Sequence, residues 1–538
     1  MTFIRSGALG ALLLSATSST ISAQTAAEPS EQSGTSVAPV ITTVGGDLQG
    51  SLGDGVENFF GVPYAEPPVG DLRWRPPAPP APWEGIRAAT DYGAACPQTY
   101  GLDSPRVEDE DCLFLNLQRP EGTAADARLP VLVLIHGGGW RTGSGNNENL
   151  DAMVRENGII GVTMNYRLGN LGNLAHPALT AEAGQSGNYG FLDQQAALRW
   201  VQENIAAFGG DPAQVTIAGE SAGGGSVCVH MTAPSSEGLF SRAVMMSTLC
   251  NATPLPEAER IGTSIAGALG CTGADAAACL REASVASLID VPEVAWQIIS
   301  NTGFLPREPY RALQSGEFRK VPVLIGATRD EARSLLTDWA TTSVPVWDED
   351  GYEAYVRESF GEDAEAVLTV YPWPEDATRY TGTYLVADVM IENLLPGEGS
   401  LSPCKTNRIT EILAPQVPTF AYEWAHTDAS GWFEIPGYVW GAGHATELPY
   451  LIPHRGNAAF NSNVFGDDER QIAQEMRAYW GAFAKAGDPN GGGQPEWPAY
   501  KPGEGPILRL VGGDDLAAVP AAALRAAHNC DFWESLED

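Results

Sequence analysis

The chain has 538 residues, a formal net charge of -36 and a sequence pI of about 4.4. Its composition is 43% hydrophobic and 18% charged, which is ordinary for a globular protein with a large core and excludes a chain that is disordered throughout. A surface this acidic repels nucleic acid and anionic membranes, so we expect no nucleic-acid partner.

Residues 1–23 have the pattern of a secretory signal peptide. Arg5 gives a positive start, a mostly apolar run follows, and small residues lead to Ala23. Residues 24–38 are small, polar and acidic, which predicts a flexible leader, and we expect residues 39–538 to form one domain. The pattern predicts a secreted or periplasmic protein. No later segment offers ~20 unbroken apolar residues, so we expect no membrane insertion.

Apolar β-rich runs alternate with helix-like segments through the first half of the chain. In chain order we expect strands or helices at Leu129–His136 (strand), Gly158–Tyr166 (strand), Gly190–Phe208 (helix), Gln214–Ala218 (strand), Ala222–Met231 (helix), Ala243–Met246 (strand), Glu257–Leu269 (helix), Val321–Gly326 (strand), Asp350–Val370 (helix) and Gln471–Ala484 (helix). Strands separated by helices predict an α/β fold with a mostly parallel sheet and helices on both faces. The helical stretches at 257–269 and 350–370 are expected to be insertions that cap the sheet.

Residues 219–223 read Gly-Glu-Ser-Ala-Gly, the GxSxG pattern of a nucleophile elbow. The expected strand before it and the expected helix after it are the context that this motif requires. Glycines are needed at both ends of the motif because side chains there would collide with neighbouring backbone. The turn lifts the Ser221 hydroxyl to the top of the sheet, so Ser221 is the candidate nucleophile.

A glycine-rich segment, His136-Gly-Gly-Gly-Trp140, ends the first of these strands and matches the oxyanion loop of lipases and esterases. Its glycines let the backbone approach a substrate and aim N–H groups at one oxygen. Each such donor lowers the barrier by about 3 kcal/mol. The N–H of Ala222 is the other expected donor, and His136 is expected to be structural because the backbone supplies the hydrogen bonds.

A serine nucleophile needs a general base. His444 lies far downstream in Gly-Ala-Gly-His-Ala-Thr-Glu (441–447), which fits the nucleophile, acid, histidine order of the hydrolase fold. Position alone leaves His426 and His454 as alternatives. No CxxC pair and no HExxH motif occurs, so we expect no metal and no cofactor.

Several longer motifs resemble those of the type B carboxylesterases, the family that includes cholinesterases and bile-salt-activated lipases. They are FGVPYAEPPVGDLR (60–73), EDCLFLNL (110–117), NYRLG (165–169), FGGDP (208–212), GESAGG (219–224) and FAKAGDPN (483–490). The resemblance runs from about residue 40 to the C-terminus. It implies an α/β-hydrolase fold with helical insertions over the active site, and hydrolysis of carboxylic esters through an acyl-enzyme.

The resemblance also implies roles for individual residues. It assigns a catalytic triad to Ser221, Glu331 and His444. Asp330 and Glu331 both follow the strand that begins at Val321, and adjacent side chains in an extended chain point in opposite directions, so only one can face His444. The family pattern selects Glu331. The implied oxyanion donors are Gly138, Gly139 and Ala222. Two further positions match a buried supporting network in the family, Glu220 and Ser226.

Eight cysteines are an even number in an exported context, which favours disulfides. Three pairings resemble those of the family: Cys96–Cys112, Cys271–Cys279 and Cys404–Cys530. Cys228 is expected to be a buried thiol in the helix after Ser221, and Cys250 is expected to be free as well.

The substrate is a small-molecule ester whose identity the sequence leaves open. No long apolar lid segment is evident and Trp140 can narrow the acyl side, so we expect soluble esters with short acyl chains. One alternative is a lipase acting on long-chain or sterol esters. Another is a non-catalytic adhesion protein of the same family, which the presence of all three triad residues disfavours. The loop between Cys96 and Cys112 has no tryptophan to hold a choline cation, so selectivity for quaternary ammonium is not expected.

Overall fold

The computed structural model describes residues 37–99, 106–248, 250–291, 298–338, 341–392, 401–429, 431–453, 465–511 and 516–537. The predicted signal peptide and most of the predicted leader lie outside these residues. The first strand begins at Val37, two residues before the expected start of the domain. It is an edge strand whose register is irregular between Val37 and Val40, a place where a strand tolerates a proline such as Pro39.

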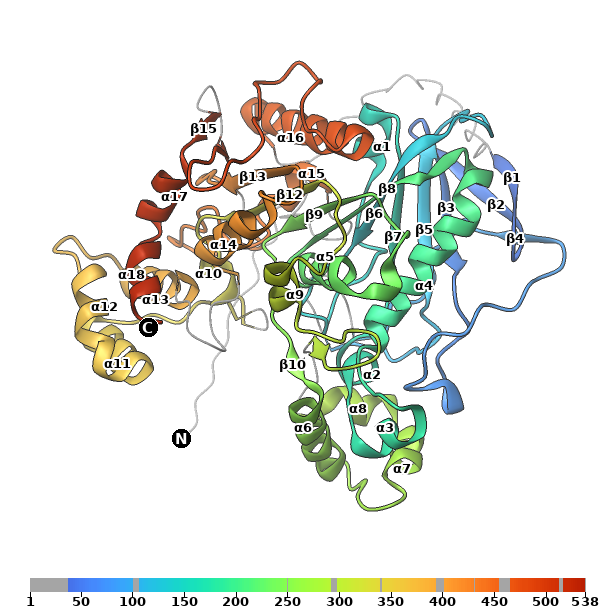
Figure 1. The fold of residues 1–538 in the computed structure, drawn as a ribbon, viewed down its shortest axis with the longest axis horizontal. Helices are drawn as coiled ribbons and strands as arrows, with labels where there is room; N and C mark the ends of the chain where they lie inside the picture. Colours follow the sequence, from blue (N-terminus) through green and yellow to red (C-terminus); the bar gives the residue numbers. More distant parts are fainter. Residues whose placement is uncertain are drawn as a thin grey trace, which may run out of the picture. The chain divides into compact units, whose positions relative to one another are not determined.

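One large sheet organises the described part of the chain (Figure 1). Its 13 strands are β1 (Val37–Thr43), β2 (Gly46–Gly53), β3 (Val56–Pro63), β4 (Ile86–Ala88), β5 (Phe114–Pro120), β6 (Leu129–Ile135), β7 (Ile160–Met164), β8 (Gly210–Glu220), β9 (Arg242–Met246), β12 (Val323–Thr328), β13 (Thr419–Trp424), β14 (Ile507–Leu510) and β15 (Ala517–Val519). Their order is β1-β2-β3-β5-β7-β6-β8-β9-β12-β13-β14-β15, with β4 beside β2. Strands β7 to β14 of this order are paired in parallel, and the antiparallel pairs lie toward the two edges. A small separate sheet joins β10 (Thr253–Pro254) to β11 (Ile299–Ser300).

Helices follow most of the parallel strands. They are α1 (Asp151–Asn157), α2 (Gly169–Asn173), α3 (Pro177–Ala183), α4 (Tyr189–Asn204), α5 (Ala222–Thr232), α6 (Leu255–Ala268), α7 (Ala276–Glu282), α8 (Val285–Asp290), α9 (Pro309–Ser315), α10 (Ala332–Leu335), α11 (Glu349–Phe360), α12 (Ala364–Val370), α13 (Thr381–Glu392), α14 (Pro403–Leu413), α15 (Leu448–Leu451), α16 (Asp467–Ala486), α17 (Ala521–Ala527) and α18 (Cys530–Ser535). Within the described ranges, no helix combines the length and the apolar character needed to cross a membrane.

Side chains along the central strands alternate between two cores. In β6, Val131, Val133 and Ile135 join a core with residues of α4, α5, α9 and α14. Leu132 and Leu134 join the opposite core with residues of α1, α15 and α16. Because both faces are covered, the strand is an unbroken apolar run. The predicted α/β fold, with a mostly parallel sheet between two layers of helices, is confirmed.

The expected single helix at 350–370 is two helices. Helix α11 ends at Phe360 and α12 begins at Ala364, with Gly361 between them at a φ of 52°. A residue with positive φ cannot continue a right-handed helix, and glycine adopts that conformation without a steric penalty. Both helices pack with α13, α17 and α18 around Tyr352 and Trp533.

All eight cysteines lie in the described part of the chain, and all are paired. The three predicted disulfides are present. The expectation that Cys228 and Cys250 are free is wrong, because these two residues form a fourth disulfide. Helix α5 packs on the end of β9, where Ser221 N–H donates to the Met246 carbonyl at 3.0 Å. The chain that leaves β9 therefore crosses α5, and the Cα atoms of Cys228 and Cys250 are 5.8 Å apart.

A buried ionic cluster, the C-terminal latch, holds the link between α17 and α18. It consists of His528, Glu392 of α13 and Glu423 of β13. His528 Nδ1 lies 2.8 Å from a Glu392 oxygen, and its Nε2 lies 2.9 Å from a Glu423 oxygen. Burial by itself lowers the pKa of His528, but the hydrogen bonds and charges of the two carboxylates outweigh it and raise the pKa to about 9.

Replacing His528 with glutamine should destabilise the protein by about 3–5 kcal/mol, because Glu392 would remain buried without a cation and Glu423 would keep only its ion pair with Arg509. In the wild type this contribution should be complete below the ordinary pKa of 6.5 and be lost as the pH rises toward 9. Urea unfolding between pH 6 and pH 10 measures both effects. Arg260→Gln, which removes an exposed ion pair, is the control and should change stability little. A His528→Gln protein as stable as the wild type at every pH would contradict the role of the latch.

Candidate active site

Ser221 lies on the turn between β8 and α5. Its backbone has a φ of 56° and a ψ of -122°, a strained conformation for a residue other than glycine. The glycines on either side are required by space. A Cβ atom on Gly219 would lie 2.3 Å from the carbonyl carbon of Gly223, and one on Gly223 would lie 2.1 Å from the Ile135 oxygen. The turn leaves Ser221 half-buried at the N-terminus of α5, whereas its neighbours are buried.

The oxyanion-loop glycines have backbone conformations that side chains disfavour. Gly138 has a φ of 98° and Gly139 a φ of 63°. The Gly138 carbonyl closes a turn by accepting from the N–H groups of Arg141 and Thr142, at 3.1 and 3.0 Å. Among the described residues, no hydrogen bond uses the N–H groups of Gly138, Gly139 or Ala222. These three donors are therefore free to bind an oxygen.

Ser226 connects this loop to α5. Its hydroxyl donates to the Ala222 carbonyl at 2.9 Å and accepts from Trp140 Nε1 at 3.1 Å and from Gln194 Nε2 at 3.0 Å. The Trp140 ring is buried and packs edge-on against Phe191 of α4. These contacts direct the indole toward α4 and α5, so they do not support the expectation that it narrows the acyl side.

His444 and Glu331 are in contact and buried. His444 Nδ1 hydrogen-bonds to Glu331 Oε2, and the second oxygen of Glu331 accepts from Thr328 N–H at 3.0 Å. The backbone N–H of His444 also donates to the Glu331 carbonyl, at 3.1 Å. The glutamate therefore fixes both the ring and the backbone of the histidine.

The other ring nitrogen of His444 faces the nucleophile turn. His444 Nε2 lies 3.1 Å from Glu220 Oε1, outside hydrogen-bonding geometry. In the described part of the chain no hydrogen bond joins His444 to the Ser221 hydroxyl, although Glu220 directly precedes Ser221. Such contacts are often long before substrate binds and shorten in the substrate complex.

The alternative bases lie elsewhere. His426 packs edge-on against Trp424 and Tyr450, and His454 lies outside the described residues. His136 stacks on Tyr166, and burial lowers its pKa to about 4. A neutral, stacked His136 agrees with the structural role expected for it.

The carboxylesterase family model matches residues 37–533. This chain belongs to the carboxylesterase family. It is 35% identical to the pyrethroid hydrolase Ces2e of Rattus norvegicus, over 93% of this chain and 90% of that protein. It is 34% identical to the fumonisin B1 esterase of Sphingopyxis macrogoltabida (89% and 88%) and 32% identical to the cocaine esterase of Homo sapiens (93% and 91%).

The fold comparison agrees. A solved structure of a PNB esterase superimposes with a TM-score of 0.74 at 29% sequence identity, covering 91% of this chain and 99% of that one. The protein is a carboxylic ester hydrolase with the α/β-hydrolase fold.

The esterase has a third buried glutamate near His444, which the sequence reasoning did not assign. Burial, with the charges of Glu220 and Glu331, raises the pKa of Glu447 well above its ordinary value. Neither of its carboxylate oxygens has a hydrogen-bond partner among the described residues. Its position three residues after His444 was visible in the motif, but its burial was not.

The charges around His444 set its protonation. Burial by itself lowers the pKa of His444, but the charges of Glu220 and Glu331 outweigh this and raise it above the ordinary 6.5. Burial also raises the pKa of Glu220, to about 7, and Glu331 adds to this effect while His444 opposes it.

The esterase should therefore lose activity as the pH falls through a His444 pKa above 6.5, because only the neutral ring accepts a proton. Glu220→Gln should shift this acidic limb of kcat/KM to lower pH by about 1 unit, since it removes a negative charge beside the ring. Glu237→Gln, at an exposed ion pair, is the control. A rate that stays constant down to about pH 4, well below the pKa of an ordinary histidine, would contradict a histidine base.

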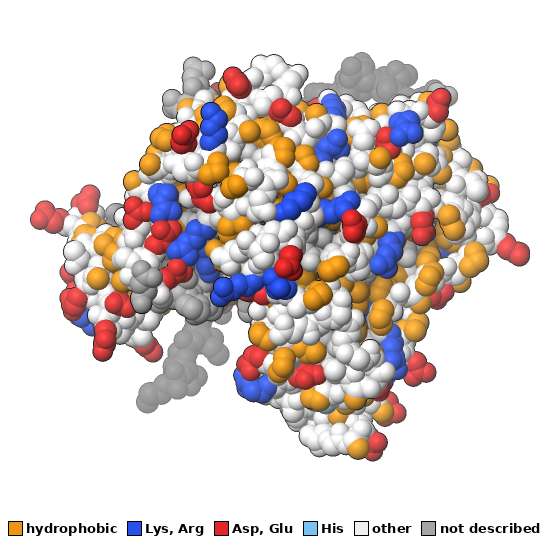
Figure 2. Space-filling model, viewed as in Figure 1, with side chains coloured by type: hydrophobic (Ala, Val, Ile, Leu, Met, Phe, Trp, Pro, Cys, Tyr) orange, Lys and Arg blue, Asp and Glu red, His pale blue; other side chains and the backbone are white. Residues whose placement is uncertain are grey.

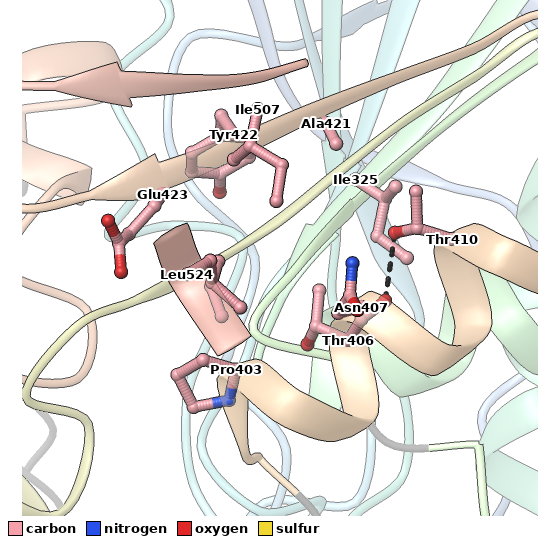
Figure 3. Close-up of a pocket in the computed structure, with 11 residues that line it drawn as sticks. Ile325, Pro403, Thr406, Asn407, Thr410, Ala421, Tyr422, Glu423, Ile507 and Leu524 are labelled. Carbon is pink, nitrogen blue, oxygen red and sulfur yellow. Dashed lines mark hydrogen bonds between the residues drawn. The ribbon is translucent and has the colours of Figure 1, made fainter. Parts of the chain in front are cut away.

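A separate pocket lies between the sheet and helices α14 and α17 (Figure 3). Its lining residues are Ile325, Ala327, Pro403, Thr406, Asn407, Thr410, Ala421, Tyr422, Glu423, Ile507 and Leu524. None of the candidate site residues lines it. Thr406 Oγ1 and Asn407 Oδ1 have no hydrogen-bond partner among the described residues, which suits a buried water.

Proposed function

We propose that this carboxylesterase is exported and hydrolyses esters through an acyl-enzyme on Ser221. The observation that carries the proposal is a buried His444, held by Glu331, whose other ring nitrogen faces the turn that carries the strained, half-buried Ser221. The N–H groups of Gly138, Gly139 and Ala222, which have no hydrogen-bond partner in the described part of the chain, support it.

The mechanism has two steps. Ser221 Oγ attacks the ester carbonyl while His444 Nε2 takes its proton, and the three N–H groups stabilise the resulting oxyanion. When the oxyanion collapses, the C–O bond to the alcohol breaks and His444 returns the proton to the departing alcohol. Water then attacks the acyl group, His444 accepts its proton, and the acid leaves as Ser221 is regenerated. Glu331 stabilises the charged ring in both steps.

Covalent labelling tests the nucleophile. An organophosphonate should phosphonylate Ser221, and peptide mapping of the labelled protein should find the mass increase on the peptide that contains it. A label at another residue would overturn the assignment.

For export, we propose that residues 1–23 are removed as a signal peptide and that a short leader precedes β1. Pairing of all eight cysteines supports an oxidising compartment. N-terminal sequencing of protein from its natural source tests this, and the mature chain should begin near Gln24. A mature chain that still begins at Met1 would contradict export by this route.

For the substrate, we propose soluble esters with short acyl chains, on the ground that the sequence has no evident long apolar lid segment. The relatives are named for different molecules and favour no single ester. The net charge of -36 favours neutral or cationic esters over anionic ones. Acidic and basic side chains are intermingled on the face shown in Figure 2, so we base the preference on the net charge of the whole chain.

This preference predicts that kcat/KM for a neutral ester exceeds that for its carboxylate-bearing analogue, and that added salt narrows the gap. Salt acts because the screening length falls from about 10 Å at 0.1 M to about 3 Å at 1 M. Steady-state kinetics with a matched ester pair at both salt concentrations measures it. Faster turnover of the anionic ester at low salt would contradict the prediction.

One observation favours the alternative of a lipase. Val439 is 53% exposed beside the aromatic cluster of Tyr380, Tyr438 and Trp440, and Leu335 is 41% exposed on α10. These two exposed apolar side chains lie within five residues of His444 and Glu331 along the chain, and an apolar contact there would suit a long acyl chain. Kinetics with a series of esters of increasing acyl chain length separates the two functions. If the acyl chain binds an apolar surface, each buried CH₂ adds about 0.8 kcal/mol of binding free energy. A preference for acyl chains beyond about twelve carbons would establish the lipase.

A further inference from the structure

We propose that Asp330 is a positioning residue of this esterase, and that its carboxylate holds the His444 loop (residues 440–447) where His444 meets Glu331. The inference rests on the proposed Ser221 mechanism. Two adjacent acids would then position His444: Glu331 orients its imidazole ring, and Asp330 holds the backbone of the loop that carries it.

The contacts form a short ladder between the end of β12 and the His444 loop. Asp330 N–H donates to the Ala442 carbonyl at 2.8 Å, and Ala442 N–H donates back to Asp330 Oδ2 at 2.9 Å. Two residues further along, His444 N–H donates to the Glu331 carbonyl at 3.1 Å. One side chain, that of Asp330, therefore contributes to a ladder that otherwise uses backbone atoms.

The Asp330 carboxylate is itself held in place. Arg329 Nη2 lies 2.8 Å from Oδ2, and Arg333 Nη2 lies 3.4 Å from Oδ1. The aspartate side chain is 8% exposed. Burial by itself raises the pKa of Asp330, but the two arginines and the Ala442 N–H lower it below its ordinary value. The carboxylate is thus charged and fixed when it accepts from the loop.

The loop passes so close to this carboxylate that position 441 must be glycine. A Cβ atom on Gly441 would lie 2.5 Å from Asp330 Oδ2, and the residue has a φ of 60°. The chain just before the loop is held independently by α13, where Val439 N–H donates to Tyr384 Oη at 2.8 Å. Loss of the Asp330 contact should therefore move His444 while the loop stays attached.

The test compares two substitutions at one position. Asp330→Ala removes the acceptor and should lower kcat by about 30- to 100-fold with KM little changed, because a shift near 1 Å in a reacting group costs about 10²-fold. Asp330→Asn keeps an oxygen that can accept from Ala442 N–H, so it should restore most of kcat despite losing the charge. Phosphonylation of Ser221 should slow in the same order, since it needs the same base.

Two further variants control for folding. Asp348→Ala removes an exposed carboxylate-to-backbone hydrogen bond, at the start of α11, and should leave kcat at the wild-type value. Gly441→Ala should displace the loop from an intact Asp330, and should therefore lower kcat as Asp330→Ala does. The proposal thus stays testable if Asp330→Ala fails to fold.

The outcomes separate this inference from the proposed function. Wild-type kcat in Asp330→Ala or in Gly441→Ala, with normal labelling of Ser221, would overturn the role of Asp330 alone. An equal loss of kcat in Asp330→Ala and Asp330→Asn would also overturn it, because the retained acceptor would then be irrelevant. Labelling of the wild type at a residue other than Ser221 would overturn the proposed function first.

Discussion

Replacing Ser221 with alanine should lower kcat by about four to six orders of magnitude, because the members of a triad act as a unit. Without the hydroxyl no acyl-enzyme can form, and His444 has no serine proton to accept. The free N–H groups of Gly138, Gly139 and Ala222 would still polarise a bound ester, so a small residual rate above the uncatalysed one is expected. Steady-state kinetics with a soluble chromogenic ester measures the loss.

The variant should fold normally, since Ser221 is half-buried and no hydrogen bond to its hydroxyl occurs among the described residues. Ser241→Ala is the matched control. Ser241 directly precedes β9, and its hydroxyl donates to the carbonyl of Val215 in β8. Thermal unfolding of both variants separates lost chemistry from lost structure. Turnover within tenfold of wild type in Ser221→Ala would remove the serine from the mechanism.

Local patterns predicted the nucleophile turn because its requirements are local. Positions 219 and 223 must be glycine because a Cβ atom there would collide with backbone atoms. For Gly219 these atoms belong to the same strand–turn–helix unit, and for Gly223 they belong to the neighbouring strand β6. The alternation of Val131 to Ile135 between two cores likewise follows from an apolar run covered on both faces. These features need only the periodicity of a strand and the size of a side chain.

Features that depend on contacts between distant segments could not be read in this way. Nothing in the sequence around Cys228 shows that the chain leaving β9 crosses α5, so its pairing with Cys250 was missed. Glu447 was visible as a residue, but its burial beside Glu220 depends on how the His444 loop folds back. The break at Gly361 was missed because the apolar spacing continues across it.

The choice between Asp330 and Glu331 as the acid of the triad could be made only in part from local sequence. Adjacent side chains point in different directions, so the sequence showed that only one of them faces His444. Family resemblance selected the glutamate, and the contact between His444 Nδ1 and Glu331 agrees with that choice. The other acid, Asp330, accepts a hydrogen bond from Ala442 N–H, and this contact is the basis of its proposed positioning role.

Glu331→Gln should lower kcat by about three to four orders of magnitude, although the two side chains have nearly the same shape. One oxygen of Glu331 accepts from Thr328 N–H and the other from His444 Nδ1. A glutamine has only one oxygen, and Thr328 N–H can only donate, so the amide NH₂ should face His444. The ring must then accept at Nδ1 and carry its proton on Nε2, which is the nitrogen that has to receive the serine proton.

This tautomer argument makes the test specific. Glu331→Gln should keep KM and thermal stability close to wild type while kcat and the rate of Ser221 phosphonylation fall together. Asp330→Asn, the neighbouring substitution of the same kind, should lose far less because its retained oxygen can still accept from Ala442 N–H. If Glu331→Gln is nearly as active as wild type while Asp330→Asn is inactive, the acid of the triad is Asp330. The hydrogen bond between Glu331 and His444 would then serve folding alone.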